Sequence, residues 1–389
     1  MNERGFLDYY EKRNIIPVSQ HIGNFAGHVR RRTALYRSLG LSTLSFRDSD
    51  VLEFGPGTGD NALVTLGFEP RSLTLVDANS ASIEILQSKI VALNPNRVEL
   101  VQVDFNSEEL TVKLEGRKFD IVLAEACLPG QISPLSSLRK ISNLVRGDDG
   151  MLVVTSMDQM SSLSELCRRY MKPAIANSSN GTFEDAVEIA CDVFSTHLDA
   201  LPHASRLIQD WVLDVILHPW PHNWALSMDK AIDELDDFDF LGSSPNFFED
   251  WRWYKQFSNQ SEEWSGLASK RWVQVAPYTL DHRIDIKVIN YAPFSRGQNL
   301  FELCQEFGRL SYDSWTKDSY SNIDYVKTIL HDICGELSDR PEFFGTVRSI
   351  EDFCVGLPRL ANGDLSYSYN EFKSWWGRGQ QYVSFSRKI

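Results

Sequence analysis

Between residues 50 and 156, short apolar runs alternate with stretches whose apolar positions recur at helical spacing. The short runs predict five strands, at Val51–Phe54, Ser72–Val76, Val98–Val103, Phe119–Ala124 and Met151–Thr155. The stretches between them predict helices at Asn61–Leu66, Ser80–Leu93 and Ser136–Val145. Short apolar strands separated by amphipathic helices are typical of a parallel sheet covered on both faces. The pattern therefore predicts an α/β fold of the Rossmann-like type.

The flanking segments have a mostly helical pattern. Two helices are expected before the strands, at Phe6–Arg13 and Phe25–Leu39, and helices follow them at 159–171, 182–200, 204–218, 227–236, 298–316, 323–337 and 367–376. Further strands are expected at Phe238–Leu241, at Arg283–Tyr291 and, from its period-two alternation, at Gln381–Arg387. Because no flexible linker separates these parts, the helical material is interpreted as insertions that decorate one sheet.

The end of the first predicted strand carries the run VLEFGPGTGD, with glycines at positions 55, 57 and 59. Glycine lets the backbone turn sharply and leaves no side chain in the way of a ligand. The free N–H groups of the following helix then face that ligand. In parallel sheets, ligands bind beyond the carboxyl ends of the strands, so this turn predicts a nucleotide-like cofactor site.

Two classes of cofactor use such a turn, and the spacing separates them. Dinucleotide enzymes have G-x-G-x-x-G, whereas Gly59 comes one place early and Asp60 stands where a small residue is needed. An aspartate there would oppose a pyrophosphate, and Glu53 before the turn favours a cationic cofactor. Asp77, at the end of the second strand, suits ribose hydroxyls in either class. Asp104 and Phe105, after the third strand, suit the amine and the face of an adenine.

The runs VLEFGPGTG, LTLVDAN, VQVDF, FDIVLAEACLPG and GMLVVTS, in this order, resemble the motif series of class I S-adenosylmethionine-dependent methyltransferases. The resemblance covers residues 50–156. It implies S-adenosylmethionine as cofactor, and it implies the cofactor-binding residues Glu53, Gly55, Gly57, Gly59, Asp77, Asn79, Asp104 and Phe105. It also implies a sheet that ends in an antiparallel sixth and seventh strand. IIPVSQ and GSSPNFFEDWRWYK further resemble segments of bacterial methyltransferases of small-molecule or cell-surface-glycan pathways, without implying catalytic residues.

These expectations divide the chain around one core. The expected parts are an N-terminal helical segment (1–46), a cofactor-binding core (47–156), a helical cap insertion (157–236), a core strand (237–245), a second helical insertion (246–376) and a C-terminal core strand (377–389).

Candidate catalytic residues are a carboxylate and two histidines. Glu125 follows the fourth strand in an apolar run, where an unpaired carboxylate is costly, and it can act as a general base. The alternatives for Glu125 are hydrogen bonds to neighbouring backbone N–H groups or a contact with the donor's methionine amine. His28 and His203 are the other candidate bases. In the run Arg30–Arg32, either all three arginines form a solvated face or one of them meets an anionic substrate group.

Composition narrows the class of partner. The net charge of −14 disfavours nucleic acid and anionic membranes, and no apolar run approaches the length of a membrane span. Six scattered cysteines without metal-type spacing indicate reduced thiols, a cytoplasmic location and no metal site. The strand end at Glu125 also lacks the Asn/Asp-Pro-Pro-Tyr/Phe signature of many amino-group methyltransferases, which disfavours DNA bases and glutamine as acceptors.

The sequence therefore predicts a methyltransferase acting on an oxygen or nitrogen of a small molecule, such as a glycan precursor or a secondary metabolite, with a homodimer allowed. Two alternatives stay open: an NAD(P)-dependent oxidoreductase, and a non-catalytic cofactor-binding scaffold subunit.

Overall fold

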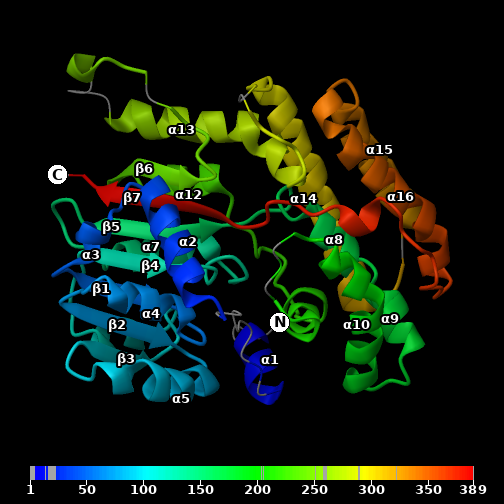
Figure 1. Cartoon of the computed structure of the whole chain (residues 1–389). Coiled ribbons are helices and arrows are strands. Elements are labelled where there is room, and N and C mark those ends of the chain that lie inside the picture. The colour runs from blue at the N-terminus through cyan, green and yellow to red at the C-terminus, as the bar shows by residue number, and fades with distance from the viewer. Residues whose placement is uncertain are drawn as a thin grey trace. The chain divides into compact units, whose positions relative to one another are not determined.

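The computed structural model describes residues 5–13, 15, 23–202, 204, 206–249, 251–256, 261–287, 290–320 and 322–388 (Figure 1). By the contacts between its residues, the chain forms two compact units. Unit 1 comprises residues 1–157, 223–272 and 380–389, and unit 2 comprises residues 158–222 and 273–379. The unit boundaries thus cut both predicted helical insertions, because residues 223–236 and 246–272 join the unit of the sheet.

Unit 1 is built on a seven-stranded sheet with the order β3-β2-β1-β4-β5-β7-β6. The strands are β1 (Asp50–Phe54), β2 (Ser72–Asp77), β3 (Val98–Gln102), β4 (Ile121–Ala124), β5 (Met151–Ser156), β6 (Phe238–Ser244) and β7 (Gln381–Arg387). The first five strands are parallel, and β7 is antiparallel to both β5 and β6. β7 alone is therefore reversed, and β6 runs in the direction of the first five. This confirms the predicted Rossmann-like sheet and its antiparallel seventh strand, whereas the expectation that the sixth strand is reversed relative to the first five is wrong.

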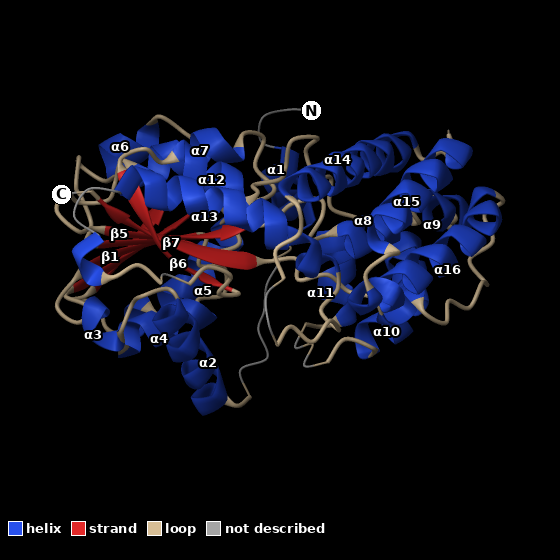
Figure 2. Ribbon diagram, turned by 90° about the horizontal axis from the view of Figure 1, so that it is seen from above, coloured by secondary structure: helices blue, strands red, loops and turns tan. Residues whose placement is uncertain are grey.

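Helices cover both faces of this sheet (Figure 2). One face carries α2 (Phe25–Ser38), α3 (Thr43–Phe46), α4 (Asp60–Gly67) and α5 (Ser80–Lys89). The other carries α6 (Glu109–Lys113), α7 (Pro134–Ser142) and α12 (Met228–Glu234). Unit 1 also contains α1 (Gly5–Arg13) and most of α13 (Ser261–Val275). Because both faces are covered, the central strands are buried almost throughout, as their continuous apolar runs predict.

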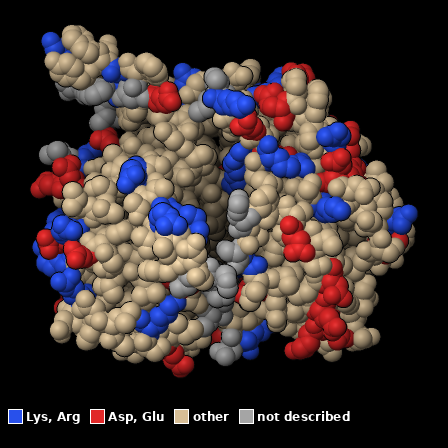
Figure 3. Space-filling model, in the orientation of Figure 1, with Lys and Arg blue, Asp and Glu red and all other residues tan. Residues whose placement is uncertain are grey.

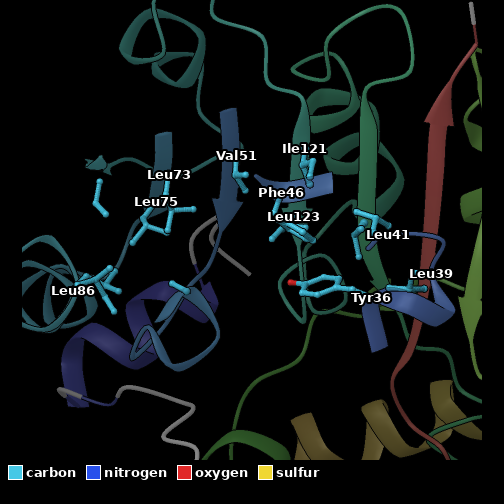
Figure 4. Close-up of a cluster of buried hydrophobic side chains, with 14 residues drawn as sticks. Tyr36, Leu39, Leu41, Phe46, Val51, Leu73, Leu75, Leu86, Ile121 and Leu123 are labelled. Atoms are coloured by element: carbon cyan, nitrogen blue, oxygen red, sulfur yellow. The ribbon is translucent and has the colours of Figure 1, made fainter. Parts of the chain in front are cut away.

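The core of unit 1 lies between the sheet and the α2–α5 layer (Figure 4). Tyr36 of α2 and Leu39, the residue after that helix, belong to one cluster with Val51, Ile121 and Leu123 of the central strands. At about 25 cal/mol per Å² of buried apolar surface, such a core is the main stabilising term of the unit.

Unit 2 is helical in its described part. It comprises α8 (Leu163–Arg169), α9 (Lys172–Ser178), α10 (Phe183–Asp199), α11 (Ile208–Trp211), α14 (Phe294–Lys317), α15 (Ile323–Leu337) and α16 (Phe344–Ala361), with a π-helical turn at Val212–Ile216. The predictions at 159–171, 182–200, 298–316 and 323–337 correspond to helices here.

Two predictions of secondary structure are wrong, and one helix was missed. The described residues of 283–291 form no strand, and most of 367–376 is irregular apart from a 3₁₀ turn at Phe372–Ser374. The helix α16, in contrast, was not predicted. Its single proline, Pro358, lies in the last turn of the helix, and a proline signals a break when only the sequence is considered.

Candidate functional site

The turn after β1 has the bare backbone that its glycines predict. Gly55, Gly57 and Gly59 all have positive φ angles, of 61°, 56° and 77°, which side chains rarely tolerate. A Cβ added at Gly55 would lie 3.0 Å from Cβ of Cys127, in the loop after β4. Gly59 directly precedes α4, so the turn exposes main-chain N–H groups at the beginning of that helix.

The acidic residue after this turn is not free to repel an anion. Asp60 forms an ion pair with Lys89 of α5 and accepts a hydrogen bond from Thr58 Oγ1 at 2.8 Å. Its charge is therefore compensated, and the argument that Asp60 repels a pyrophosphate is wrong. The argument from the position of the third glycine still holds, because position 59 needs a glycine. A Cβ there would come within 2.9 Å of Leu86 and Ile90.

Asp77 ends β2 directly beside the glycine turn. Its carboxylate accepts hydrogen bonds from the backbone N–H of Asn79 at 2.9 Å and of Gly57 at 3.4 Å. Burial raises the pKa of Asp77 to about 6, although these N–H groups lower it. Asn79 begins α5 by accepting from the Ala81 N–H, and its amide donates to the carbonyl of Ile15. Asp77 is thus a fixed acceptor that joins the loops after β1 and β2.

The residues after β3 follow the same edge of the sheet. Phe105 is buried, and its ring lies 5.5 Å from that of Phe54 at the end of β1. Asp104 accepts from the Asn106 N–H at 2.8 Å, which fixes the turn after β3. The sheet therefore brings Asp77, Asp104 and Phe105 to one edge, as the strand ends predict.

Glu53 is buried at only 5% exposure, and its Oε2 has no hydrogen-bond partner among the described residues. Burial raises the pKa of Glu53 to about 8, with a further contribution from the nearby charge of Glu125. A buried carboxyl group with an unpaired oxygen is costly unless a ligand satisfies it. Glu53 is therefore suited to receive a cationic group.

Glu125 belongs to a buried cluster with two residues of α2. Its Oε1 accepts from Arg32 Nη2 at 2.6 Å and from the Tyr36 hydroxyl at 3.0 Å, while Arg32 also donates to that hydroxyl. Its Oε2 is buried without a partner among the described residues. Of the three arginines at 30–32, Arg30 and Arg31 are exposed, and Arg32 meets this internal carboxylate. A sequence gives no sign of this pair, whose members are 93 positions apart.

The loop that carries Glu125 has a constrained backbone. Ala126, the next residue, has a φ of 58°, an uncommon value for a residue with a side chain. Its N–H donates to Thr155 Oγ1, at the end of β5, at 2.5 Å. Backbone strain of this kind costs roughly 1–3 kcal/mol and clusters at functional sites.

His28 lies one helical turn before Arg32, and Tyr36 one turn after it, so the three share a buried face of α2. Burial, together with the charges of Arg32 and Arg31, lowers the pKa of His28 below 6.5. His28 is therefore neutral at pH 7, and its Nε2 has no partner within the described structure. His203, the other histidine proposed as a base, lies outside the described residues.

Neither a metal cluster nor a membrane-spanning helix is present among the described residues. No group of three or more His, Cys, Asp or Glu side chains there could hold a metal ion. None of the helices described has the length and apolar content needed to cross a membrane. On the face shown in Figure 3, acidic and basic side chains are interspersed among residues of other kinds.

The fold and the glycine turn define a Rossmann-like, nucleotide-cofactor-binding protein. Residues 25–218, from the beginning of α2 into unit 2, match the family model described as a methyltransferase domain. This part of the chain belongs to the family of class I S-adenosylmethionine-dependent methyltransferases. Its cofactor is S-adenosylmethionine, and the nicotinamide alternative is set aside.

Solved structures give weaker likenesses. The [4+2]-cyclase SpnF is 11% identical, with 93% of this chain and 81% of that chain covered and a TM-score of 0.37. A putative sarcosine dimethylglycine methyltransferase from Galdieria sulphuraria is 9% identical, with 93% and 87% covered and a TM-score of 0.37. The N-methyltransferase NodS from Bradyrhizobium japonicum is 15% identical, with 39% and 74% covered and a TM-score of 0.30. Structural similarities with TM-scores this low give no information about the acceptor. No curated protein matches the chain in sequence.

Proposed function

We propose that the protein transfers the methyl group of S-adenosylmethionine to an oxygen or nitrogen of a small molecule, such as a glycan precursor or a secondary metabolite. The net charge of −14 supports a small acceptor over a nucleic acid. The loop after β4, which reads Glu125-Ala126-Cys127, also differs from the signature of many enzymes that methylate amino groups of DNA bases or glutamine. A cytoplasmic location and a homodimer complete the proposal.

We propose that the donor is held by the residues at the strand ends. Three features of this edge fit a cationic donor that carries a ribose. They are the bare turn at positions 55–59, the fixed acceptor Asp77, and the buried Glu53 oxygen that has no partner among the described residues. The full set is Glu53, Gly55, Gly57, Gly59, Asp77, Asn79, Asp104 and Phe105. When bound, S-adenosylmethionine supplies a methyl group that its sulfonium already activates.

The protein's own contribution is then to align the acceptor, exclude water and remove a proton. Alignment of reacting groups can be worth about 7–11 kcal/mol of the barrier. Glu125 is the proposed base, because Arg32 and Tyr36 fix one of its oxygens and leave the other, buried Oε2 without a partner in the described structure. That oxygen can accept the proton of a hydroxyl or amine. This free oxygen is the observation that carries the proposal.

His28 is a second candidate base, favoured by its lowered pKa and its unpartnered Nε2 within the described structure. A neutral imidazole accepts a proton directly, so it would act in place of Glu125 and not through it. The effect of each substitution on turnover distinguishes the two.

The test follows methyl transfer from labelled S-adenosylmethionine into a panel of small hydroxylated and amino compounds, with nucleic acid as a separate arm. We expect Glu125→Gln to lower kcat by roughly 10²–10⁴-fold and to leave S-adenosylhomocysteine affinity within a few-fold. Gln keeps an oxygen for Arg32 and Tyr36, so the fold should survive, which circular dichroism checks. The matched control, Glu109→Gln on the exposed surface of α6, should leave kcat unchanged.

Full activity of Glu125→Gln would remove Glu125 as the base, and a loss in His28→Gln instead would assign the role to His28. Transfer of the label to nucleic acid, and not to any small molecule, would contradict the proposed acceptor. Turnover with any acceptor excludes the alternative of a scaffold subunit.

A further inference from the structure

Two carboxyl groups and one guanidinium group share a buried cluster at the ends of β1 and β4. Glu53 lies in β1, and Glu125 directly follows β4, which pairs with β1 so that Glu53 stands opposite Leu123. The side chain of Glu125 is 8% exposed and that of Arg32 is 7% exposed. Arg32 compensates one negative charge, so a second ionised carboxylate in this cluster would be uncompensated.

The contacts decide which carboxyl group is the charged one. Glu125 pairs with Arg32 at 2.6 Å and accepts a hydrogen bond from the Tyr36 hydroxyl, so its negative charge is compensated. Glu53 has no such partner in the described part of the chain, and the negative charge of Glu125 lies nearby. A buried carboxyl group in this position keeps its proton.

Among the residues that the structure describes, the other titratable groups facing the cluster supply no positive charge. Tyr36 and Tyr382 face it from α2 and β7, and burial raises the pKa of each phenol, that of Tyr382 to about 12. Burial likewise raises the pKa of the Cys127 thiol, in the loop after β4. Along α2, His28 has a lowered pKa, and Asp60 beside it is paired with Lys89.

We infer that Glu53 carries a proton in the donor-free protein, next to the Arg32–Glu125 ion pair, and that binding of the donor releases this proton to solvent. The amino-acid part of the donor carries an ammonium group. The neutral Glu53 carboxylic acid becomes a carboxylate paired with that ammonium, and one proton leaves for water, so charge and atoms balance. This inference rests on the methyl-donor site of the proposed function and not on the acceptor.

A consequence is that protons compete with the donor. Below the pKa of Glu53, the affinity should rise roughly tenfold per pH unit, and it should level off above that pKa. The lower pKa of Asp77, about 6, means that Asp77 is mostly ionised at pH 7 and contributes little to the release.

Titration calorimetry of the full chain with S-adenosylhomocysteine tests the inference, in buffers of different ionisation enthalpy at about pH 7. This probe carries the same ammonium group without the sulfonium. The wild type should release close to one proton per molecule bound. Glu53→Gln should release almost none and should bind with an affinity that does not change between about pH 6 and pH 8.

Glu125→Gln should also lose most of the release, because the negative charge of residue 125 then no longer opposes ionisation of Glu53, whereas the positive charge of Arg32 remains. Glu109→Gln should behave as the wild type. Binding to the wild type without proton release would overturn the inference and leave the methyltransferase function intact. If the wild type failed to bind S-adenosylhomocysteine, both would be overturned. The pH dependence of the wild type alone decides the matter if a variant does not fold.

Discussion

At the scale of single residues, the acceptor at the end of β2 separates donor binding from folding. Asp77 is fixed by the N–H groups of Gly57 and Asn79, and it is the proposed partner of the ribose hydroxyls. Hydrogen bonds to a charged acceptor are worth about 1.5–3 kcal/mol each. We therefore expect Asp77→Ala to weaken S-adenosylhomocysteine binding by about a hundredfold or more while the protein remains folded.

Asp77→Asn is the matched variant, because it keeps the shape and one acceptor oxygen but loses the charge. Calorimetry should place its affinity between those of the wild type and Asp77→Ala. Unchanged affinity in Asp77→Ala would show that Asp77 does not hold the donor.

The sequence predicts residues of this site only where a local pattern marks them. Glu53, Asp77 and Asp104 could be singled out because each ends a strand or adjoins its end in a parallel sheet. The partners of Glu125 could not, because Arg32 and Tyr36 reach it only through the packing of α2 against the sheet. The one available signal was the spacing of four between His28, Arg32 and Tyr36, which places them on one helix face.

At the scale of elements, the packing of the glycine turn against α5 depends on the third glycine of the turn. Gly59 has a φ of 77°, and a Cβ there would lie 2.8 Å from Leu86 Cδ2. We expect Gly59→Ala to lower the free energy of unfolding by roughly 1–3 kcal/mol and to weaken S-adenosylhomocysteine binding. Urea unfolding measures the first effect and calorimetry the second.

Gly67, the last residue of α4, provides the control, because a Cβ there would meet nothing within 4 Å. Gly67→Ala should be neutral or stabilising by up to about 1 kcal/mol. Equal stability of the two variants would show that the turn tolerates a side chain.

The elements of the sheet were more predictable from the sequence than those of unit 2. β1, β2, β4 and β5 are buried almost throughout, so each reads as a short apolar run bounded by polar residues, whereas the edge strand β3 exposes Glu99 and Gln102. The segment 283–291 also has alternating apolar residues, but its described part pairs with no strand. Periodicity alone does not show whether a partner strand is present.

At the scale of the whole molecule, the buried carboxyl groups should make stability depend on pH. Burial raises the pKa of Glu53 from 4.5 to about 8, so between these values the folded state binds more protons than the unfolded state. The free energy of unfolding therefore falls as the pH rises through this range. Between about pH 6 and pH 8, deprotonation of Glu53 should lower the free energy of unfolding by about 2 kcal/mol.

Glu53→Gln removes the titrating carboxyl group. Urea unfolding at pH 6 and pH 8 should therefore show a smaller fall in the free energy of unfolding for the variant than for the wild type. Asp77 adds to the fall only below its pKa of about 6. Parallel pH profiles for the wild type and Glu53→Gln would show that Glu53 is already ionised.

The division into two units limits what the family assignment explains. The residues proposed to hold the donor, and Glu125, all lie in unit 1, and the matched stretch extends into unit 2 through residue 218. The helical segments of unit 2 carried no motif that could be tied to a reaction. The methyl donor can therefore be predicted from sequence and structure, whereas the acceptor remains a proposal.

The central claim is that the strand ends of unit 1 hold S-adenosylmethionine. Titration calorimetry of the full chain with S-adenosylhomocysteine, and separately with NAD⁺, tests it most directly. We predict saturable binding of one S-adenosylhomocysteine per chain and no binding of NAD⁺. Binding of NAD⁺, with none of S-adenosylhomocysteine, would contradict the account.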